Sequence, residues 1–400
     1  MINEMNDVET QEGTSARQAG RSTQVAAIIA ACASSAVFLG LPVVIGQLAQ
    51  LRGLTPDQLG EVASAETLGV ALTATFGSWF IRRFKPKQLM VVGLQCLLVL
   101  QLLSATAWSY PAFILLRVGA SLASGVVLPA SIAVLSRASN PERSFSWLVS
   151  CQIALSAIEL FTFGPIANVL GMGGIYGALV LLCVLALMFL APTTMPALLE
   201  DGSASTQGRI SPVIWVMVGA VFLFFCSIGA YWAFIERAGA QAGMSPDEVG
   251  GWLAASNVAA LAGSVSAPWF CRRFGERAVL LLGSVLVALV PVGLLLGASG
   301  RLGYLIDLCL FVVLWNLLMI VQMALLGRWD PTGRAVSMTP AAQGLGLALA
   351  PLGAGAVAAR YGFIAAVASS SCFALASLIA TWSALRRRAN ESAMQQHSLS

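Results

Sequence analysis

Long apolar runs alternate with short polar segments along almost the whole chain. A helix needs about 20 mostly apolar residues to cross the hydrocarbon core of a bilayer. Irregular backbone is not tolerated against lipid, so each run is expected to be helical. The pattern predicts twelve transmembrane spans, at residues 25–49, 60–80, 89–108, 112–135, 146–170, 175–195, 213–236, 251–270, 278–298, 303–326, 337–358 and 363–385.

A polar stretch between the sixth and seventh spans divides the chain into two sets of six. We therefore expect a cytoplasmic N-terminal tail at 1–24 and a first six-helix bundle at 25–196. A cytoplasmic linker at 197–212 would lead to a second bundle at 213–385, followed by a cytoplasmic C-terminal tail at 386–400.

The two sets of spans repeat one another at an offset of 190 residues. Residues 53–60 read GLTPDQLG and residues 243–250 read GMSPDEVG. Residues 79–84 read WFIRRF and residues 269–274 read WFCRRF, in the same register. Because each set holds six spans, the repeats run parallel rather than inverted. The predicted fold is an all-α membrane protein of two related six-helix bundles.

Composition agrees with this architecture. The chain is 58% hydrophobic and 10% charged, with a mean hydropathy of +0.83, whereas soluble domains carry about a quarter charged residues. Its single histidine lies in the C-terminal tail, and no Gly-Lys-Ser or Gly-Lys-Thr motif for binding ATP phosphates is present. We therefore expect no enzyme, no metal site, no cofactor and no nucleic-acid partner.

The basic residues indicate the topology. Seventeen of the 22 lysines and arginines lie in alternate segments between the spans, four lie in the opposite segments, and Arg117 lies inside a span. Cytoplasmic loops carry the excess of lysine and arginine. We expect a multi-pass protein of the bacterial inner membrane with both termini in the cytoplasm.

Three motifs, in the loop at 78–87, at Arg117 and at Gly164-Pro165, are similar to those of the major facilitator superfamily, and the resemblance extends over essentially all of residues 25–385. The loop at Ser78–Lys87 resembles the family's Gly-x-x-x-Asp-Arg-x-Gly-Arg-Arg signature, with Arg82 in place of the acid. Arg117 resembles the arginine of the family's fourth span. Gly164-Pro165 resembles the core of the antiporter motif, without the glycine pair that follows it.

The resemblance, strongest to bacterial drug or metabolite:proton antiporters, implies a monomeric secondary transporter that works by alternating access. It would export a small organic solute in exchange for protons, with lipid as its surroundings. Proton-coupled uptake of an organic acid or a siderophore is one alternative, and a solute sensor that transports nothing is another. The gating-loop candidates, which could also serve only as topology signals, are Arg82, Arg83, Arg272 and Arg273.

Four ionisable residues inside the spans are candidates for proton coupling, because a charge in the bilayer is costly and is therefore a functional hypothesis. They are Glu66, Glu159, Arg117 and Asp307. Arg117 and Asp307 occupy equivalent places in the repeat and could form a charge pair that closes the outer side. Alternatively, Arg117 and a glutamate form a purely structural pair, and Asp307 reaches water from the span end.

The substrate cavity is expected to combine a polar stripe with aromatic walls. Gln152, Ser156, Glu159 and Phe163 share one helical face through spacings of four, three and four. The aromatic candidates, which could instead pack or contact lipid, are Phe225, Tyr231, Trp232, Phe311 and Trp315.

The charge bias gives a direct test of the topology. Reporter fusions after Gln207 and after Ser400 should both show cytoplasmic activity, because the positively charged segments remain inside. An external signal at either position would contradict the twelve-span arrangement.

Overall fold

The computed structural model describes residues 20–106, 109–138, 140–195, 211–296, 300–330 and 334–397. Within these ranges the side chains of 74–82, 141–142, 334–337 and 392–397 are not described. The described elements are all helices, and they follow the predicted spans closely. They are α2 (Arg21–Leu39), α3 (Leu41–Arg52), α4 (Pro56–Arg83), α5 (Pro86–Thr106), α6 (Tyr110–Leu135), α7 (Pro141–Leu190), α8 (Pro212–Gln241), α9 (Pro246–Phe274), α10 (Glu276–Leu295), α11 (Arg301–Trp329), α12 (Arg334–Tyr361) and α13 (Phe363–His397).

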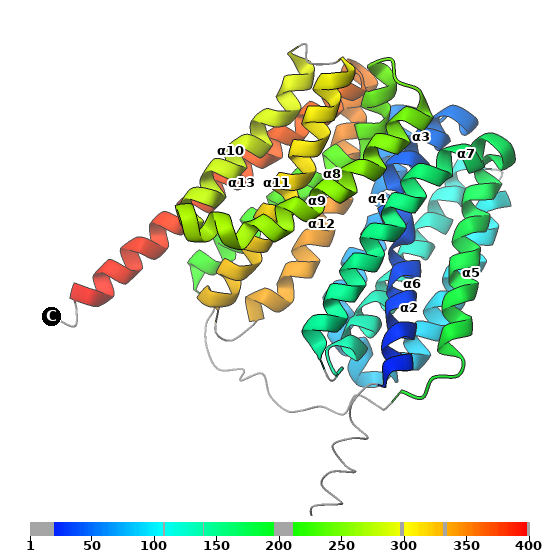
Figure 1. The fold of residues 1–400 in the computed structure, drawn as a ribbon, viewed down its shortest axis with the longest axis horizontal. Helices are drawn as coiled ribbons and strands as arrows, with labels where there is room; N and C mark the ends of the chain where they lie inside the picture. The colour runs from blue at the N-terminus through cyan, green and yellow to red at the C-terminus, as the bar shows by residue number, and fades with distance from the viewer. Residues whose placement is uncertain are drawn as a thin grey trace, which may run out of the picture.

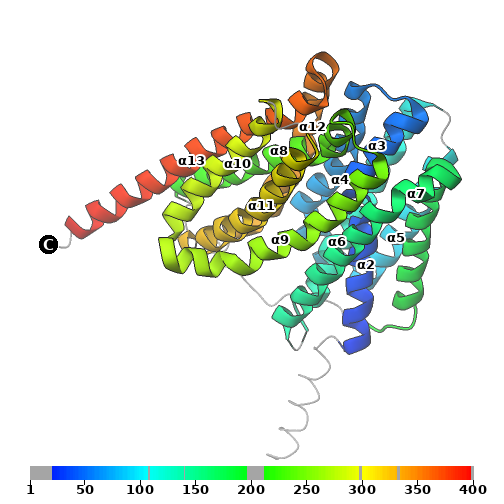
Figure 2. The same ribbon diagram turned by 45° about the horizontal axis from the view of Figure 1, so that its top comes forward.

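The helices form two groups that lie side by side (Figure 1). The first, from α2 to α7, is coloured blue to green, and the second, from α8 to α13, is coloured green to red. The turned view shows the same separation (Figure 2). Two six-helix bundles are confirmed, while the predicted domain boundaries at the linker and tails fall partly outside the described residues.

Helix α7 holds two spans. Its helix is interrupted at Gly171, which has φ 64° and ψ −162°, a conformation that only glycine adopts readily. The break falls between the predicted spans 146–170 and 175–195. Within the described residues, nine helices are long and apolar enough to cross a membrane, with α7 counted once. The more polar α4 and α9, of 28 and 29 residues, supply the remaining long helices.

The prediction of one continuous helix over 25–49 is wrong, because the first span is broken at Gly40 between α2 and α3. The physical reason is Pro42, which has no amide hydrogen to donate to the Phe38 carbonyl one turn earlier. The amide of Val43 bonds the Gly40 carbonyl instead of continuing the α-helical ladder. The break lies where α3 approaches the second bundle.

The repeated eight-residue motif builds the start of α4 and of α9. Its first glycines, Gly53 and Gly243, have φ of 62° and 84°. Ser245 and Glu248 form a reciprocal capping box at the start of α9, in which each side chain accepts from the backbone amide of the other. Thr55 and Gln58 form the same pair of bonds at α4.

The last glycine of each motif lets one bundle touch the backbone of the other. A Cβ on Gly60 would lie 2.5 Å from the Pro351 carbonyl oxygen of α12. A Cβ on Gly250 would lie 2.6 Å from the Leu160 carbonyl oxygen of α7. These two crossings are related by the repeat, and both lie toward the end of the molecule that carries α3, called here the α3 end. The predicted topology places this end outside.

Valine at Gly60 or Gly250 should force the bundles apart at the α3 end, because its Cβ would overlap a backbone carbonyl of the partner helix. We expect the distance between spin labels at Leu51 and Arg360 to lengthen in either variant, on a cysteine-free background that retains transport. Gly293→Val is the matched control, since nothing lies within 4 Å of a Cβ there. Equal distance distributions in all three variants and the parent would rule out this role for the glycines.

Candidate functional site

The break in the first span places two backbone carbonyl groups at the interface between the bundles. The Phe38 carbonyl accepts from the indole Nε1 of Trp232 on α8, at 3.4 Å. The Leu39 carbonyl accepts from the hydroxyl of Ser156 on α7, at 3.1 Å. Two carbonyl groups at the break are therefore bonded by side chains from both bundles, and the Phe38 carbonyl also accepts a backbone amide at the end of α2.

A third side chain extends this polar group from α9. The Asn257 amide donates to the Ser156 hydroxyl at 3.3 Å and to the Leu253 carbonyl at 3.3 Å. One face of α7 thus connects the first span to α9. We call the place where Gly40, Ser156, Trp232 and Asn257 meet the central site.

Two further residues of the polar stripe lie beside Gly40. A Cβ on Gly40 would meet the Phe163 ring at 2.8 Å and the Glu159 Cβ at 3.4 Å. Glu159 is only 2% exposed, and neither of its carboxylate oxygens has a hydrogen-bond partner. Gln152, two turns from Glu159 on the stripe, donates to the Ser35 hydroxyl at 3.1 Å. The stripe inferred from spacing therefore faces the first span.

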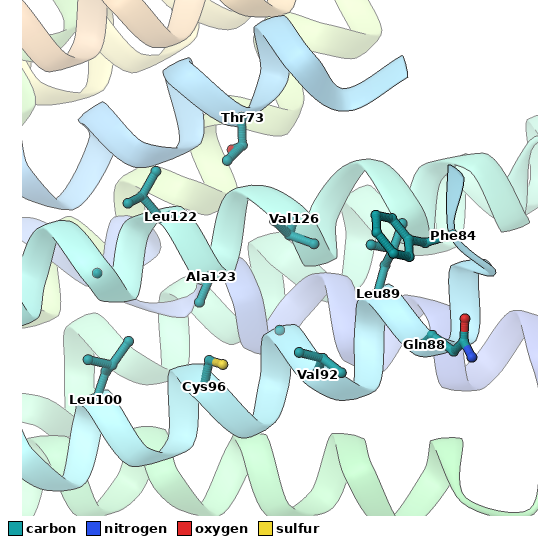
Figure 3. A pocket seen from close by; sticks show the side chains of 12 residues that line it. Thr73, Phe84, Gln88, Leu89, Val92, Cys96, Leu100, Leu122, Ala123 and Val126 are labelled. Atoms are coloured by element: carbon teal, nitrogen blue, oxygen red, sulfur yellow. The ribbon is translucent and has the colours of Figure 1, made fainter. Parts of the chain in front are cut away.

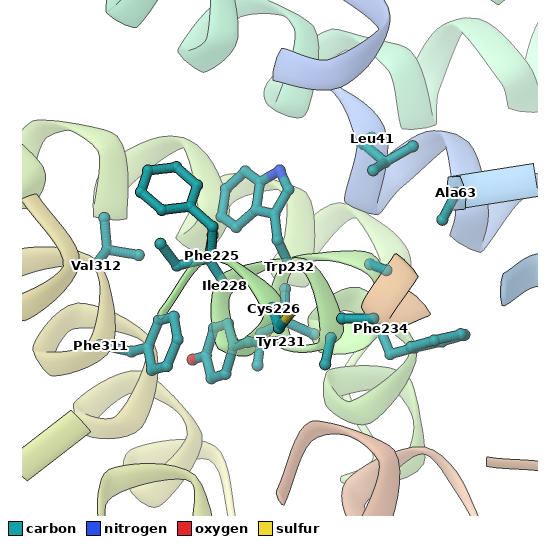
Figure 4. Close-up of a cluster of buried hydrophobic side chains, with 14 of the residues drawn as sticks. Leu41, Ala63, Phe225, Cys226, Ile228, Tyr231, Trp232, Phe234, Phe311 and Val312 are labelled. Atoms are coloured by element: carbon teal, nitrogen blue, oxygen red, sulfur yellow. The ribbon is translucent and has the colours of Figure 1, made fainter. Parts of the chain in front are cut away.

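The aromatic candidates divide into two groups. Trp232 meets Trp315 edge to face, with ring centroids 5.8 Å apart. Tyr231 and Phe311 stack face to face at 3.6 Å, and both are fully buried within the second bundle. Figure 4 shows the Phe225 and Trp232 rings on one side of α8 and the Tyr231 and Phe311 rings on the other. Trp232 and Trp315 are the pair that adjoins the central site.

Arg117 lies inside the first bundle and pairs with Glu66. Its Nη1 is 3.2 Å from the Glu66 carboxylate, and its Nη2 donates to the Leu100 carbonyl and the Ser104 hydroxyl. The guanidinium also lies 4.9 Å from the centre of the Tyr176 ring. Arg117 is fully buried. Its charge is therefore compensated within its own bundle.

Asp307 is held in the second bundle. It accepts from the Tyr231 hydroxyl at 2.6 Å and is 4% exposed. The suggested pair between Arg117 and Asp307 is not formed, because each is bonded to a residue of its own bundle. Equivalent positions in the two repeats here hold opposite charges with separate partners.

The gating-loop candidates lie at the ends of α4 and α9. Arg83, Arg272 and Arg273 are exposed, while Arg82 is outside the described side chains. Nearby, Arg328 at the end of α11 forms an ion pair with Glu276 at the start of α10.

A groove of about 570 Å³ lies away from the central site, between α4, α5 and α6 (Figure 3). It is lined almost wholly by apolar side chains, among them Val92 and Leu122, which are 57% and 37% exposed. Exposed apolar side chains on membrane spans face lipid, so we do not place a polar solute there.

Sequence reasoning missed three contributors near the bundle interface. Asn257 is one polar residue in a long helix, and Gly40 with Pro42 resembles ordinary span composition. The spacing of the spans places Glu236 only at a span end, yet it is 2% exposed. Pro42 is the residue from which the break could have been predicted, because a proline inside a span cannot donate to the carbonyl group one turn earlier.

A sequence model described as the Major Facilitator Superfamily matches residues 25–327. The chain belongs to this superfamily of membrane transporters and is a multi-pass secondary transporter rather than an enzyme. A 121-residue stretch is 27% identical to the 3-(3-hydroxy-phenyl)propionate transporter of Escherichia coli strain K12. That stretch covers 30% of this chain and only 30% of that transporter's length.

Solved structures of other transporters share the fold. The nucleoside transporter NupG, in a mutant form, superposes with a TM-score of 0.76 at 12% identity, over 90% of this chain and 99% of that one. The inward-open xylose transporter XylE from E. coli gives 0.68 at 14% identity, over 90% and 95% of the two chains. A bacterial homologue of the human lysosomal transporter Spinster, in an inward-facing and occupied conformation, gives 0.71 at 11% identity, over 91% and 96%.

Removing one partner of the buried Arg117–Glu66 pair should destabilise the protein strongly. Arg117→Ala leaves a buried carboxylate without its cation, which costs about 3–5 kcal/mol. Arg301→Ala is the control, because the Arg301–Glu248 pair is exposed and such pairs contribute about 0–1 kcal/mol. Thermal unfolding in detergent should show a much larger loss for Arg117→Ala, and equal losses would contradict a structural role.

Proposed function

We propose that this protein transports small aromatic organic solutes by a proton-coupled mechanism in which the two bundles rock about the central site. The observation that carries the proposal is the broken first span. Its carbonyl groups are bonded by Ser156 and Trp232, one from each bundle. Interrupted helices at a repeat interface are where transporters of this type form binding sites.

The groups around the central site favour planar solutes that are neutral or cationic. The indole rings of Trp232 and Trp315 offer aromatic surface, and Asn257 and Gln152 offer amides. The acid in this region is Glu159. Arg117, the arginine inside a predicted span, is already bonded to Glu66. Phe225 would extend the aromatic wall, while Tyr231, Phe311 and Phe163 would support it from behind.

Glu159 is the coupling residue we propose first. A buried carboxylate without a cation or hydrogen-bond donor is unstable as an ion, so it is stable here with a bound proton. Its neighbour Gly40 belongs to the break that both bundles contact. Movement of the bundles would change the access of water to Glu159 and allow the proton to leave. Glu66 and Asp307, which have partners, are secondary candidates.

Export is the direction we propose first, as the resemblance of Gly164-Pro165 to an antiporter motif suggests. Uptake is the second candidate. It is favoured by the relative named as a 3-(3-hydroxy-phenyl)propionate transporter, a name that specifies an aromatic carboxylic acid. Transport into everted and right-side-out vesicles, energised by a proton gradient, distinguishes the two directions. We place the protein in the bacterial inner membrane with both termini in the cytoplasm.

Glu159→Gln should abolish concentrative transport of an aromatic solute driven by a proton gradient, while exchange across proteoliposomes without a gradient remains. The reason is that exchange requires no net proton movement, whereas concentration requires a titrating carboxyl group. Ser156→Ala serves as the comparison, because loss of the bond to Leu39 should weaken solute binding in both assays. Concentrative transport by Glu159→Gln at the parent rate would refute Glu159 as the proton carrier.

A further inference from the structure

Glu236 and Gly46 occupy equivalent positions in the repeat and touch each other across the bundle interface. Their numbers differ by the repeat offset of 190 residues. A Cβ on Gly46 would lie 2.1 and 2.6 Å from the two Glu236 carboxylate oxygens. The carboxyl group of α8 therefore rests directly on the backbone of α3.

The arginine next to Glu236 forms a long ion pair with it but no hydrogen bond. Arg237 Nη1 donates to the Gly46 carbonyl at 3.3 Å, and its guanidinium lies 5.6 Å from the Phe363 ring centre. Arg237 Nε is 3.8 Å from Glu236 Oε2, and that oxygen has no hydrogen-bond partner. The side-chain amide of Gln47, on α3, also has none. A 2%-exposed carboxyl group is thus enclosed with one cation, which it meets only at ion-pair distance and which donates its hydrogen bond to α3.

Among the described residues, the other groups that face this corner add no second cation. The titratable neighbour from α11 is Tyr304, whose hydroxyl donates to the Ile235 carbonyl at 3.1 Å. From α9, Val249 adjoins Gly239. Helix α12 meets α8 further in, where Leu347 approaches Gly229, and α13 contributes the Phe363 ring.

Glu236 differs from Glu66, Glu159 and Asp307 in what covers it. Glu66 and Asp307 bond residues of their own bundles, and Glu159 packs against Gly40 of its own bundle at the edge of the central site. Glu236 is covered by α3 of the opposite bundle. Its burial therefore depends on closure of the α3 end, whereas separation of the bundles would expose it to water on that side.

We propose that Glu236 is a proton-binding site whose occupancy allows the α3 end to close. With the bundles apart, water surrounds the carboxylate and it is charged. A proton from that water binds the carboxylate oxygen, and the neutral group can then be enclosed against Gly46. An ionised group would be enclosed in this position with a single long ion pair and no hydrogen bond to Oε2, which is unfavourable. Closure at the α3 end is therefore linked to the pH on that side.

The linkage has a definite sign and a limit. Closure binds one proton, so the ratio of closed to open molecules rises as pH falls, by at most tenfold per pH unit. Glu236→Gln removes the charge and should be closed at every pH. Gly46→Ala places a methyl group where the carboxylate lies and should be open at every pH.

The test is the distance between spin labels at Leu51 and Arg360, measured without solute across pH 5 to 9 on the cysteine-free background. The parent should shift from short to long distances as pH rises. Glu236→Gln should stay short, and the Glu248→Gln control should behave as the parent, because glutamine already occupies the equivalent capping position at Gln58.

Two results would overturn the proposal: a parent that shows no pH dependence, or a Glu236→Gln variant that still opens at high pH. If Glu236→Gln does not fold, Gly46→Ala decides, since a pH response like that of the parent would refute the contact. The physiological role of the Glu236 site rests on the proposed proton-coupled transport, but the pH-dependent closure itself does not. A pH-dependent distance together with transport that ignores the proton gradient would retain the Glu236 site and reject the proposed coupling.

Discussion

The break at Gly40 is the constraint on which the centre of the molecule depends. Backbone carbonyl groups inside a bilayer cannot be satisfied by lipid, so each needs a protein partner or water. Pro42 removes the amide that would bond the Phe38 carbonyl in a continuous helix. That carbonyl accepts a backbone amide at the end of α2 and the Trp232 indole, and the Leu39 carbonyl accepts from Ser156. Trp232 belongs to the second bundle and Ser156 to the first. The bonds to the carbonyl groups at the break therefore lie at the interface between the bundles.

Two kinds of buried charge follow from this architecture. Arg117 with Glu66 is compensated inside one bundle, and its burial is unaffected when whole bundles move as rigid bodies. Glu236 is enclosed only where the bundles touch, and Glu159 lies without a partner beside the broken span. Rocking of the bundles can change the surroundings of Glu236 and Glu159, but not those of the Arg117–Glu66 pair. For this reason we assign the proposed proton coupling and pH response to Glu159 and Glu236 rather than to the paired acids.

The internal repeat places glycines at equivalent positions in the two bundles, where each permits a close contact with the other bundle. Gly60 and Gly250 each permit contact with a carbonyl group of the opposite bundle. A Cβ added at either glycine would lie 2.5 or 2.6 Å from the carbonyl oxygen. These crossings obey the repeat symmetry. The contact between Gly46 and Glu236 breaks it, because equivalent positions hold a glycine in one half and an acid in the other. The symmetric contacts hold the bundles together closely, and the asymmetric contact is where we propose that a proton binds.

The sequence by itself determined the number of spans, the parallel repeat and the polar stripe that includes Ser156 and Glu159. It could do so because hydrophobic length and helical spacing are local properties. Only the tertiary structure decided which buried charges have partners. Arg117 and Asp307 align in the repeat, yet each is bonded within its own bundle, and Glu236 meets α3 far away in the chain. Such contacts depend on how helices pack across distance, which the spacing of residues along one helix does not encode.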